Sequence, residues 1–150
     1  YSLSFGKDVF GGPIWRDFVS EDEAASYEET GTIPVMLDPE GQPVKRNFVH
    51  AEDLVSAIML AIDHPNSRQE LFNVCMDEPI DYGKVAEHLK RTRGLPSVEI
   101  TTPYQSNWLD NAKAKFLLDW RPKIDLKQLV DKAWSYNRAD DDPRKIWYPG

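Results

Sequence analysis

Three side chains that could contact a ligand alternate along one short segment of this sequence, residues 44–50. Arg46, Phe48 and His50 are two residues apart, which is the period of a β-strand, so we expect them to share one face. The Arg46 guanidinium is a planar fork that suits a diphosphate or a carboxylate. Phe48 could stack on a base or a sugar, and His50 could donate a hydrogen bond. The spacing therefore predicts a ligand-binding face.

Each of these residues also has a purely structural interpretation. Arg46 could pair at the surface with an acid such as Glu40. His50 precedes a predicted helix, where a histidine often caps or packs, and Phe48 could belong to the core. The residues alone leave these alternatives open.

The segment 33–62 must position this face, and it reads as strand, turn, strand and helix. Apolar residues alternate with polar ones on both sides of the turn at 38–41, which predicts two half-buried strands. In the turn, Pro39 pre-sets φ and Gly41 closes the fourth position. The helix that follows is predicted to bury a stripe of apolar residues at 55, 58, 59 and 62 and to end at 64–65.

Further elements are predicted on both sides of this segment. We expect helices at 14–30, where 21–23 would be a solvated face or a kink, at 82–93 after Asp81, after Asp110 with Phe116 and Leu117 packing inward, and from Asp125 onward. We expect strands at 2–9, 71–75 and 98–101. Trp120 and Trp134 fall at core positions of this pattern.

Composition limits the classes of function. The 150 residues suit one domain, and 18 basic against 25 acidic residues give a net charge of −7 with no basic run, which argues against nucleic-acid or anionic-membrane partners. No apolar run reaches the length of a membrane span. Cys75 is the only cysteine, which fits a cytoplasmic location. The three histidines have no mutual spacing for a metal, so we predict no metal site.

Three motifs carry a resemblance to a known family. The run R-N-F-V-H-A-E-D-L at 46–54 resembles the R-D-[FY]-[VI]-H-V-x-D-[LV] signature of extended short-chain dehydrogenase/reductases, the NAD-dependent sugar epimerase/dehydratase proteins. The run E-L-F-N-V at 70–74 resembles their last sheet strand, and 108–122 resembles their W-x-D-x-[ST]-K-A…LGW-x-P segment. Together these motifs cover about 33–135 in the order of that family.

The resemblance implies an α/β fold: the C-terminal substrate lobe of an extended Rossmann-type enzyme, with the last sheet strands and about five helices. In sugar-nucleotide members the arginine corresponding to Arg46 binds the nucleotide diphosphate. The residue before the tryptophan, here Asn107, often lines the sugar pocket, whereas we expect Trp108 to pack. The resemblance further implies a sugar or nucleotide-sugar substrate, NAD or NADP in the full-length protein, and a homo-oligomer.

Two motifs of that family are missing from this sequence. It contains no G-x-x-G-x-x-G loop for a dinucleotide pyrophosphate and no Y-x-x-x-K pair for proton transfer. We therefore expect residues 1–150 to be the C-terminal substrate-binding part of such a protein, without its N-terminal dinucleotide-binding part. On this interpretation the chain carries no catalytic residue, and it binds no NAD(P) by itself.

One departure keeps the substrate open. Nucleotide-sugar members often carry a second diphosphate arginine about eight residues before the tryptophan, and the corresponding residue here is Ile100. The W-x-D-N at 108–111 and W-x-P-K at 120–123 also occur in relatives that oxidise free uronic acids. A non-nucleotide, uronate-type dehydrogenase is therefore an alternative, and so is a stand-alone, non-catalytic binding module.

Overall fold

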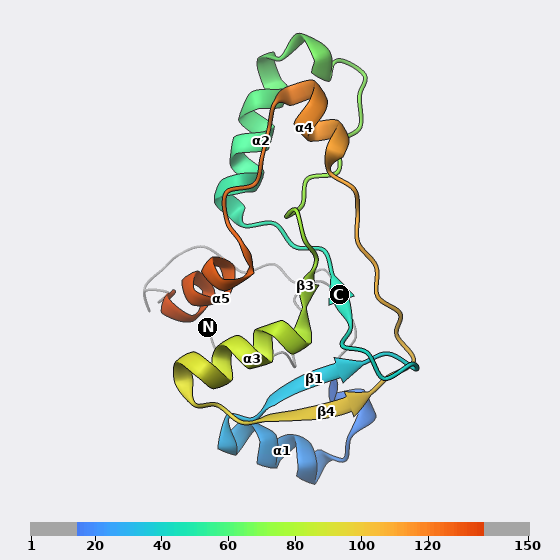
Figure 1. Cartoon of the computed structure of the whole chain (residues 1–150), viewed down its shortest axis with the longest axis vertical. Coiled ribbons are helices and arrows are strands. Elements are labelled where there is room, and N and C mark those ends of the chain that lie inside the picture. The colour runs from blue at the N-terminus through green and yellow to red at the C-terminus, as the bar shows by residue number, and fades with distance from the viewer. Residues whose placement is uncertain (1–14, 137–150) are drawn as a thin grey trace.

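The computed structural model describes residues 15–136 and shows two packed ends joined by extended segments (Figure 1). The architecture is α/β, with a small parallel sheet and five α-helices, as predicted. The elements in chain order are η1 (Trp15–Phe18), α1 (Glu21–Thr30), β1 (Ile33–Leu37), β2 (Lys45–Arg46), α2 (Ala51–Asp63), η2 (Pro65–Ser67), β3 (Ile80–Asp81), α3 (Tyr82–Arg93), β4 (Ser97–Thr101), α4 (Ala112–Leu118) and α5 (Leu126–Ser135).

The parallel sheet of β1 and β4 forms the centre of one end. Figure 1 shows α3 and α1 on opposite sides of it. Ile33 and Val35 pack into a cluster with α3 and α5, and Met36 packs with Trp15 and α1. Because helices cover both faces, four successive β1 residues are buried. The half-buried strand predicted from alternation is therefore wrong for β1.

The predicted hairpin around 38–41 is much reduced. The turn itself forms, with the Gly41 N–H donating to the Asp38 carbonyl at 3.0 Å. Beyond it the Leu37–Pro43 bridge joins β1 to the next segment, flanked by hydrogen bonds from Asp38 N–H to the Gln42 carbonyl and from Val44 N–H to the Met36 carbonyl, both at 2.8 Å. β1 pairs instead with β4 in parallel, and β2 pairs with β3 in antiparallel orientation.

Both ends of α3 and the start of α5 follow the capping signals of the sequence, whereas α4 starts after Asn111, whose side chain makes no capping hydrogen bond. Asp81 caps α3 and Asp125 caps α5, and Gly94 ends α3 with a φ of 69°, as predicted. The single helix predicted at 14–30 is wrong. Ser20 and Glu23 form a capping box that starts α1 at Glu21, so the acidic run 21–23 is the first turn of a helix rather than a kink.

The other end of the molecule contains α2, η2 and α4 (Figure 1). Its small core joins Ala57 of α2 to Ala114 and Leu118 of α4 and to Trp120. The stripe predicted to be buried on α2 is exposed instead: Ile62 is 65% and Val55 57% accessible, and the other members are Ile58 and Met59. None of the helices within residues 15–136 has the length and apolarity needed to cross a membrane.

Three other packing predictions are also wrong. Phe116 is 87% exposed, and α4 turns Ala114 and Leu118 inward instead. Trp134 is only partly covered, by the Arg93 guanidinium 4.6 Å from its ring centre, whereas Trp120 is buried as predicted. The segment 71–75 is extended but forms no ladder with a described residue, and the strand predicted at 2–9 lies outside the described residues.

Candidate functional site

The candidate site lies where β2 meets the extended segment 105–109. Lys45 of β2 receives the Asn107 N–H on its carbonyl oxygen at 3.2 Å. Its own N–H donates to Ser106 Oγ at 3.0 Å. Asn47 follows β2 directly, and its Oδ1 accepts the Leu109 N–H at 2.6 Å. These bonds hold 105–109 along β2 although the two segments are about sixty residues apart in sequence.

Arg46 lies in the middle of this attachment. Its Nη1 donates to the Gln105 carbonyl oxygen at 2.6 Å and to the Lys45 carbonyl oxygen at 3.2 Å. Among the described residues no carboxylate pairs with it. Glu40, the partner of the surface-pair alternative, instead accepts a hydrogen bond from Gln105 Nε2 at 3.3 Å. The guanidinium is thus oriented by two carbonyl groups, and no carboxylate within residues 15–136 compensates its charge.

Asn107 and Phe48 belong to the two segments that meet at this attachment. The Asn107 side chain is exposed and its backbone is fixed to Lys45, whereas Phe48 is 40% exposed and its carbonyl oxygen accepts the Met76 N–H at 2.8 Å. Trp108 was expected to pack, but it is 61% exposed. The tertiary fold therefore brings the backbone of Asn107 to β2, and the exposed surface of Asn107, Trp108 and Phe48 belongs to the two segments that meet there.

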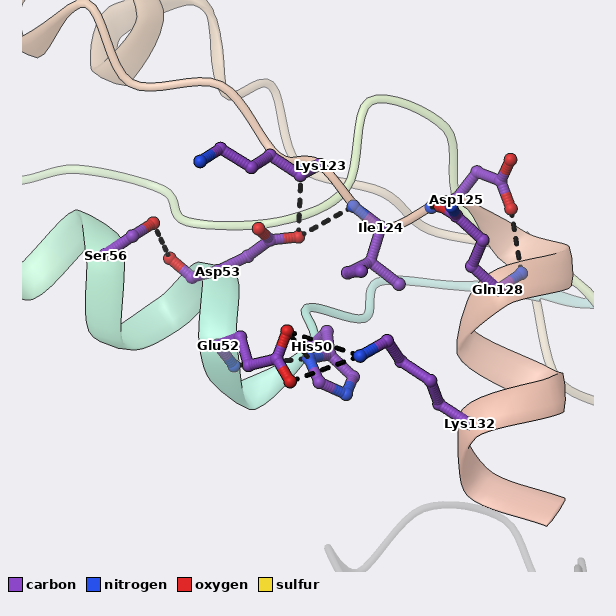
Figure 2. A network of polar contacts seen from close by, with 9 residues as sticks. All are labelled: His50, Glu52, Asp53, Ser56, Lys123, Ile124, Asp125, Gln128 and Lys132. Atoms are coloured by element: carbon purple, nitrogen blue, oxygen red, sulfur yellow. Dashed lines mark hydrogen bonds and ion pairs between the residues drawn. The ribbon is translucent and has the colours of Figure 1, made fainter. Parts of the chain in front are cut away.

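His50 has a structural role in this arrangement. Its Nδ1 accepts the Glu52 N–H at 3.2 Å, so the ring is the N-cap of α2. Figure 2 shows the ring beside Glu52, whose carboxylate bonds Lys132 of α5 at 3.2 Å. This geometry favours the capping interpretation of His50 over direct contact with a ligand.

Asp53 is a buried carboxylate whose role the sequence did not reveal. Its Oδ2 accepts the backbone N–H groups of Lys123 at 3.1 Å and Ile124 at 3.0 Å (Figure 2). The indole N–H of Trp120 donates to Ser56 Oγ at 2.8 Å. Helix α2 is thereby tied to the segment that leads into α5. The only sequence signal for this tie is an acid in the first turn of a helix, and the helix dipole alone accounts for that.

Cys75 forms a further contact with the C-terminal end of the segment 105–109. Its thiol donates to the Leu109 carbonyl oxygen at 3.4 Å, and its carbonyl oxygen accepts from Asn111 Nδ2 at 2.9 Å. Burial raises the pKa of the Cys75 thiol, and the nearby carboxylates of Asp77 and Asp110 add to this effect. The thiol is therefore a packing group rather than a nucleophile.

The site as described suits binding rather than bond-breaking chemistry. Arg46 supplies a fixed positive charge, and Asn107 supplies an amide that can donate and accept hydrogen bonds. Within residues 15–136 no group of three or more His, Cys, Asp or Glu side chains could hold a metal ion. The sequence analysis did not single out Asn47 or Ser106 as site residues. Asn47 occupies the position of the aspartate in the R-D-[FY]-[VI]-H-V-x-D-[LV] signature.

Comparisons with known proteins find similarity at the level of structure. No protein-family model matches the sequence, and no curated protein matches it. Solved structures do match. A short-chain dehydrogenase/reductase superfamily protein from Agrobacterium tumefaciens with bound NAD is 21% identical, with a TM-score of 0.63 over 75% of this chain and 36% of its own.

Two further structures agree with it. UDP-glucuronic acid 4-epimerase from Bacillus cereus is 20% identical, with a TM-score of 0.55 over 71% of this chain and 33% of its own. dTDP-glucose 4,6-dehydratase from Bacillus anthracis is 20% identical, with a TM-score of 0.56 over 71% of this chain and 35% of its own.

The matched parts are the C-terminal parts of those proteins. This chain has the fold of the C-terminal part of an extended short-chain dehydrogenase/reductase. It spans about a third of the length of the structures that it matches. The predicted resemblance is confirmed at the level of this dehydrogenase/reductase fold.

Proposed function

We propose that residues 1–150 form the C-terminal substrate-binding part of an NAD(P)-dependent epimerase/dehydratase that acts on a sugar or nucleotide-sugar. The observation that carries this proposal is the Arg46 guanidinium, which two carbonyl oxygens orient and which no described carboxylate neutralises. An oriented cation next to the exposed Asn107 suits the diphosphate of a nucleotide-sugar or the carboxylate of a uronic acid.

The matched structures support this proposal by their fold and by their chemistry. Several of them bind NAD or NADPH, and their names include epimerases and a dehydratase of nucleotide-sugars. NAD or NADP would supply hydride transfer in the complete protein, and this part would bind and orient the substrate. We also propose a cytoplasmic homo-oligomer that binds neither nucleic acid nor membrane.

Calorimetric titration of the chain with UDP-glucuronate tests the role of Arg46. Arg46→Ala removes a charge-assisted hydrogen bond, so we expect the dissociation constant to rise about tenfold or more. Arg68→Ala is the control, because Arg68 is an arginine at the end of η2, away from β2; it is exposed, whereas Arg46 is half-buried. Equal affinities of the two variants would contradict the proposal. In the complete enzyme, Arg46→Ala should raise KM more than it lowers kcat.

A uronate-type dehydrogenase is the second candidate, and Ile100 favours it. Ile100 is buried in β4, within the cluster that contains Trp15 and Met36, so an apolar core residue stands where nucleotide-sugar members often have a second arginine. This candidate predicts that free glucuronate binds about as tightly as UDP-glucuronate. A large preference for UDP-glucuronate would count against it.

The unmodified chain also serves to test binding of the cofactor. Because the sequence lacks a glycine-rich phosphate loop, we expect the chain by itself to show no strong affinity for NAD or NADP. Calorimetric titration with each dinucleotide is the measurement. Micromolar binding of either one would contradict the assignment of this chain to substrate binding alone.

A further inference from the structure

Three consecutive residues hold the segment that carries Asn107: Lys45 and Arg46 of β2, and Asn47 directly after it. Lys45 bonds Ser106 and Asn107 through its backbone, and the Arg46 side chain bonds the Gln105 carbonyl oxygen. The third attachment is the side chain of Asn47, whose Oδ1 accepts the Leu109 N–H at 2.6 Å. We propose that Asn47 is a positioning residue that fixes Asn107 beside Arg46 for ligand binding; this inference rests on the proposed function.

The geometry gives Asn47 a specific task. The Asn107 N–H bonds Lys45 on one side, and the Leu109 N–H bonds Asn47 two residues further on. Asn107 is thus held between two backbone attachments, which limits the positions of its exposed side chain. Without the Asn47 bond, no hydrogen bond among the described residues joins the segment beyond Asn107 to residues 45–47. Ordering of a binding group before the ligand arrives lowers the entropy cost of binding.

The neutrality of Asn47 matters as much as its reach. Two acids contact this network without contacting Arg46: Glu40 accepts a hydrogen bond from Gln105, and Asp81 pairs with Lys45 at 3.8 Å. The family signature has an aspartate at position 47. An aspartate there would also accept the Leu109 N–H, but it would place a carboxylate one residue from Arg46. An amide supplies the acceptor and leaves the field of the guanidinium available to an anion.

Two substitutions separate position from charge. Asn47→Ala removes the acceptor, and Asn47→Asp keeps it while adding a negative charge. Asn66→Ala is the matched control, because the Asn66 side chain also makes one exposed hydrogen bond to a distant backbone group: its Nδ2 donates to the Leu117 carbonyl oxygen at 3.3 Å. For each chain, NMR titration with UDP-glucuronate and with glucuronate gives the dissociation constant, and hydrogen exchange of the Leu109 amide reports the attachment itself.

We expect Asn47→Ala to raise the dissociation constants about three- to tenfold and to speed exchange at Leu109. Asn47→Asp should keep Leu109 protected and weaken binding about twofold at low salt, a loss that disappears at high salt because charges are then screened. Asn66→Ala should bind as the unmodified chain does.

The alternative outcomes are distinct. If Asn47→Ala binds like Asn66→Ala while Arg46→Ala does not, the positioning role is overturned and the proposed function stands. If Asn47→Asp loses as much affinity as Asn47→Ala at every salt concentration, the neutral-acceptor argument is overturned. If the unmodified chain binds neither probe, the proposed function is overturned and the binding role of Asn47 with it. Unchanged Leu109 exchange in Asn47→Ala would overturn the attachment.

Discussion

The buried carboxylate of Asp53 accepts the backbone N–H of Ile124 at 3.0 Å, across 71 residues of sequence. The same oxygen accepts the Lys123 N–H at 3.1 Å. One side chain in the first turn of α2 thus fixes the path of the chain into α5, and it does so between the two ends of the molecule (Figures 1 and 2).

Removal of the Asp53 carboxylate should therefore destabilise the fold. Asp53→Ala leaves the part-buried N–H groups of Lys123 and Ile124 without an acceptor, so we expect it to lower the free energy of unfolding by about 2 kcal/mol. Asp53→Asn keeps one acceptor oxygen and should lose less. Urea unfolding followed by circular dichroism measures both variants. The control is Asp63→Ala at the exposed end of the same helix, and a loss as small as that of this control would contradict the structural role of Asp53.

A second prediction concerns pH and the docking of α5 on α3. The Asp131 carboxylate accepts a hydrogen bond from His88 Nε2 at 3.0 Å and pairs with Arg93 at 3.1 Å. The hydrogen bond from His88 lowers the pKa of Asp131, and the charges of His88 and Arg93 act in the same direction. A carboxyl group whose pKa is lower in the folded state stabilises that state above its unfolded pKa.

That stabilisation should disappear as the pH falls through the lowered pKa of Asp131 in the folded chain. The unmodified chain should thus be more stable than Asp131→Asn at neutral pH, and the difference should shrink toward zero in acid. Thermal unfolding of both chains between pH 7 and pH 2 measures it. A difference that stays constant over this range would show that the Asp131 charge does not hold α5.

Gly83 provides a test of packing against helix propensity. It lies in the first turn of α3, where alanine would ordinarily favour the helix by about 1 kcal/mol. A Cβ at this position would lie 2.8 Å from Pro43 Cγ, in the segment that leads into β2. We expect Gly83→Ala to lower the free energy of unfolding by about 1 kcal/mol net, because overpacking outweighs propensity.

Chemical denaturation measures this effect, with the neighbouring exposed position as control. Lys84→Ala changes a residue of the same helical turn without adding a group next to Pro43, so it should be nearly neutral. A Gly83→Ala variant that is more stable than the unmodified chain would mean that the Pro43 ring moves away at little cost.

The exposed apolar stripe of α2 predicts association of the isolated chain. Val55, Ile58, Met59 and Ile62 share one exposed face, and patches of this kind promote contacts between molecules. We expect the chain to exceed its monomer mass of 17.2 kDa at micromolar concentration, and Ile58→Glu with Ile62→Glu to reduce that excess. Size-exclusion chromatography with light scattering is the measurement.

The matched control places the same kind of charge elsewhere. Ala25→Glu adds a carboxylate on an exposed helical position of α1, away from the stripe, and should leave association unchanged. A monodisperse 17.2 kDa species for the unmodified chain would contradict this prediction, and so would an equal response to Ala25→Glu.

The sequence by itself determined the features that depend on local chemistry. Asp81, Asp125 and Gly94 announced helix ends because short polar side chains and glycine satisfy those ends in any tertiary context. The turn at 38–41 formed for the same reason. The motif at 46–54 placed Arg46 on a strand and a helix after His50, and both placements hold.

Only the tertiary structure decided which surfaces are buried and which residues meet. Periodicity predicted a buried stripe on α2. The pattern shows only that the apolar residues share a face, and no other part of residues 15–136 covers that face. Likewise, no local rule pairs β1 with β4 or joins Asn47 to Leu109, since these contacts link segments about sixty residues apart. The site at Arg46 exists because those long-range bonds bring Asn107 to it.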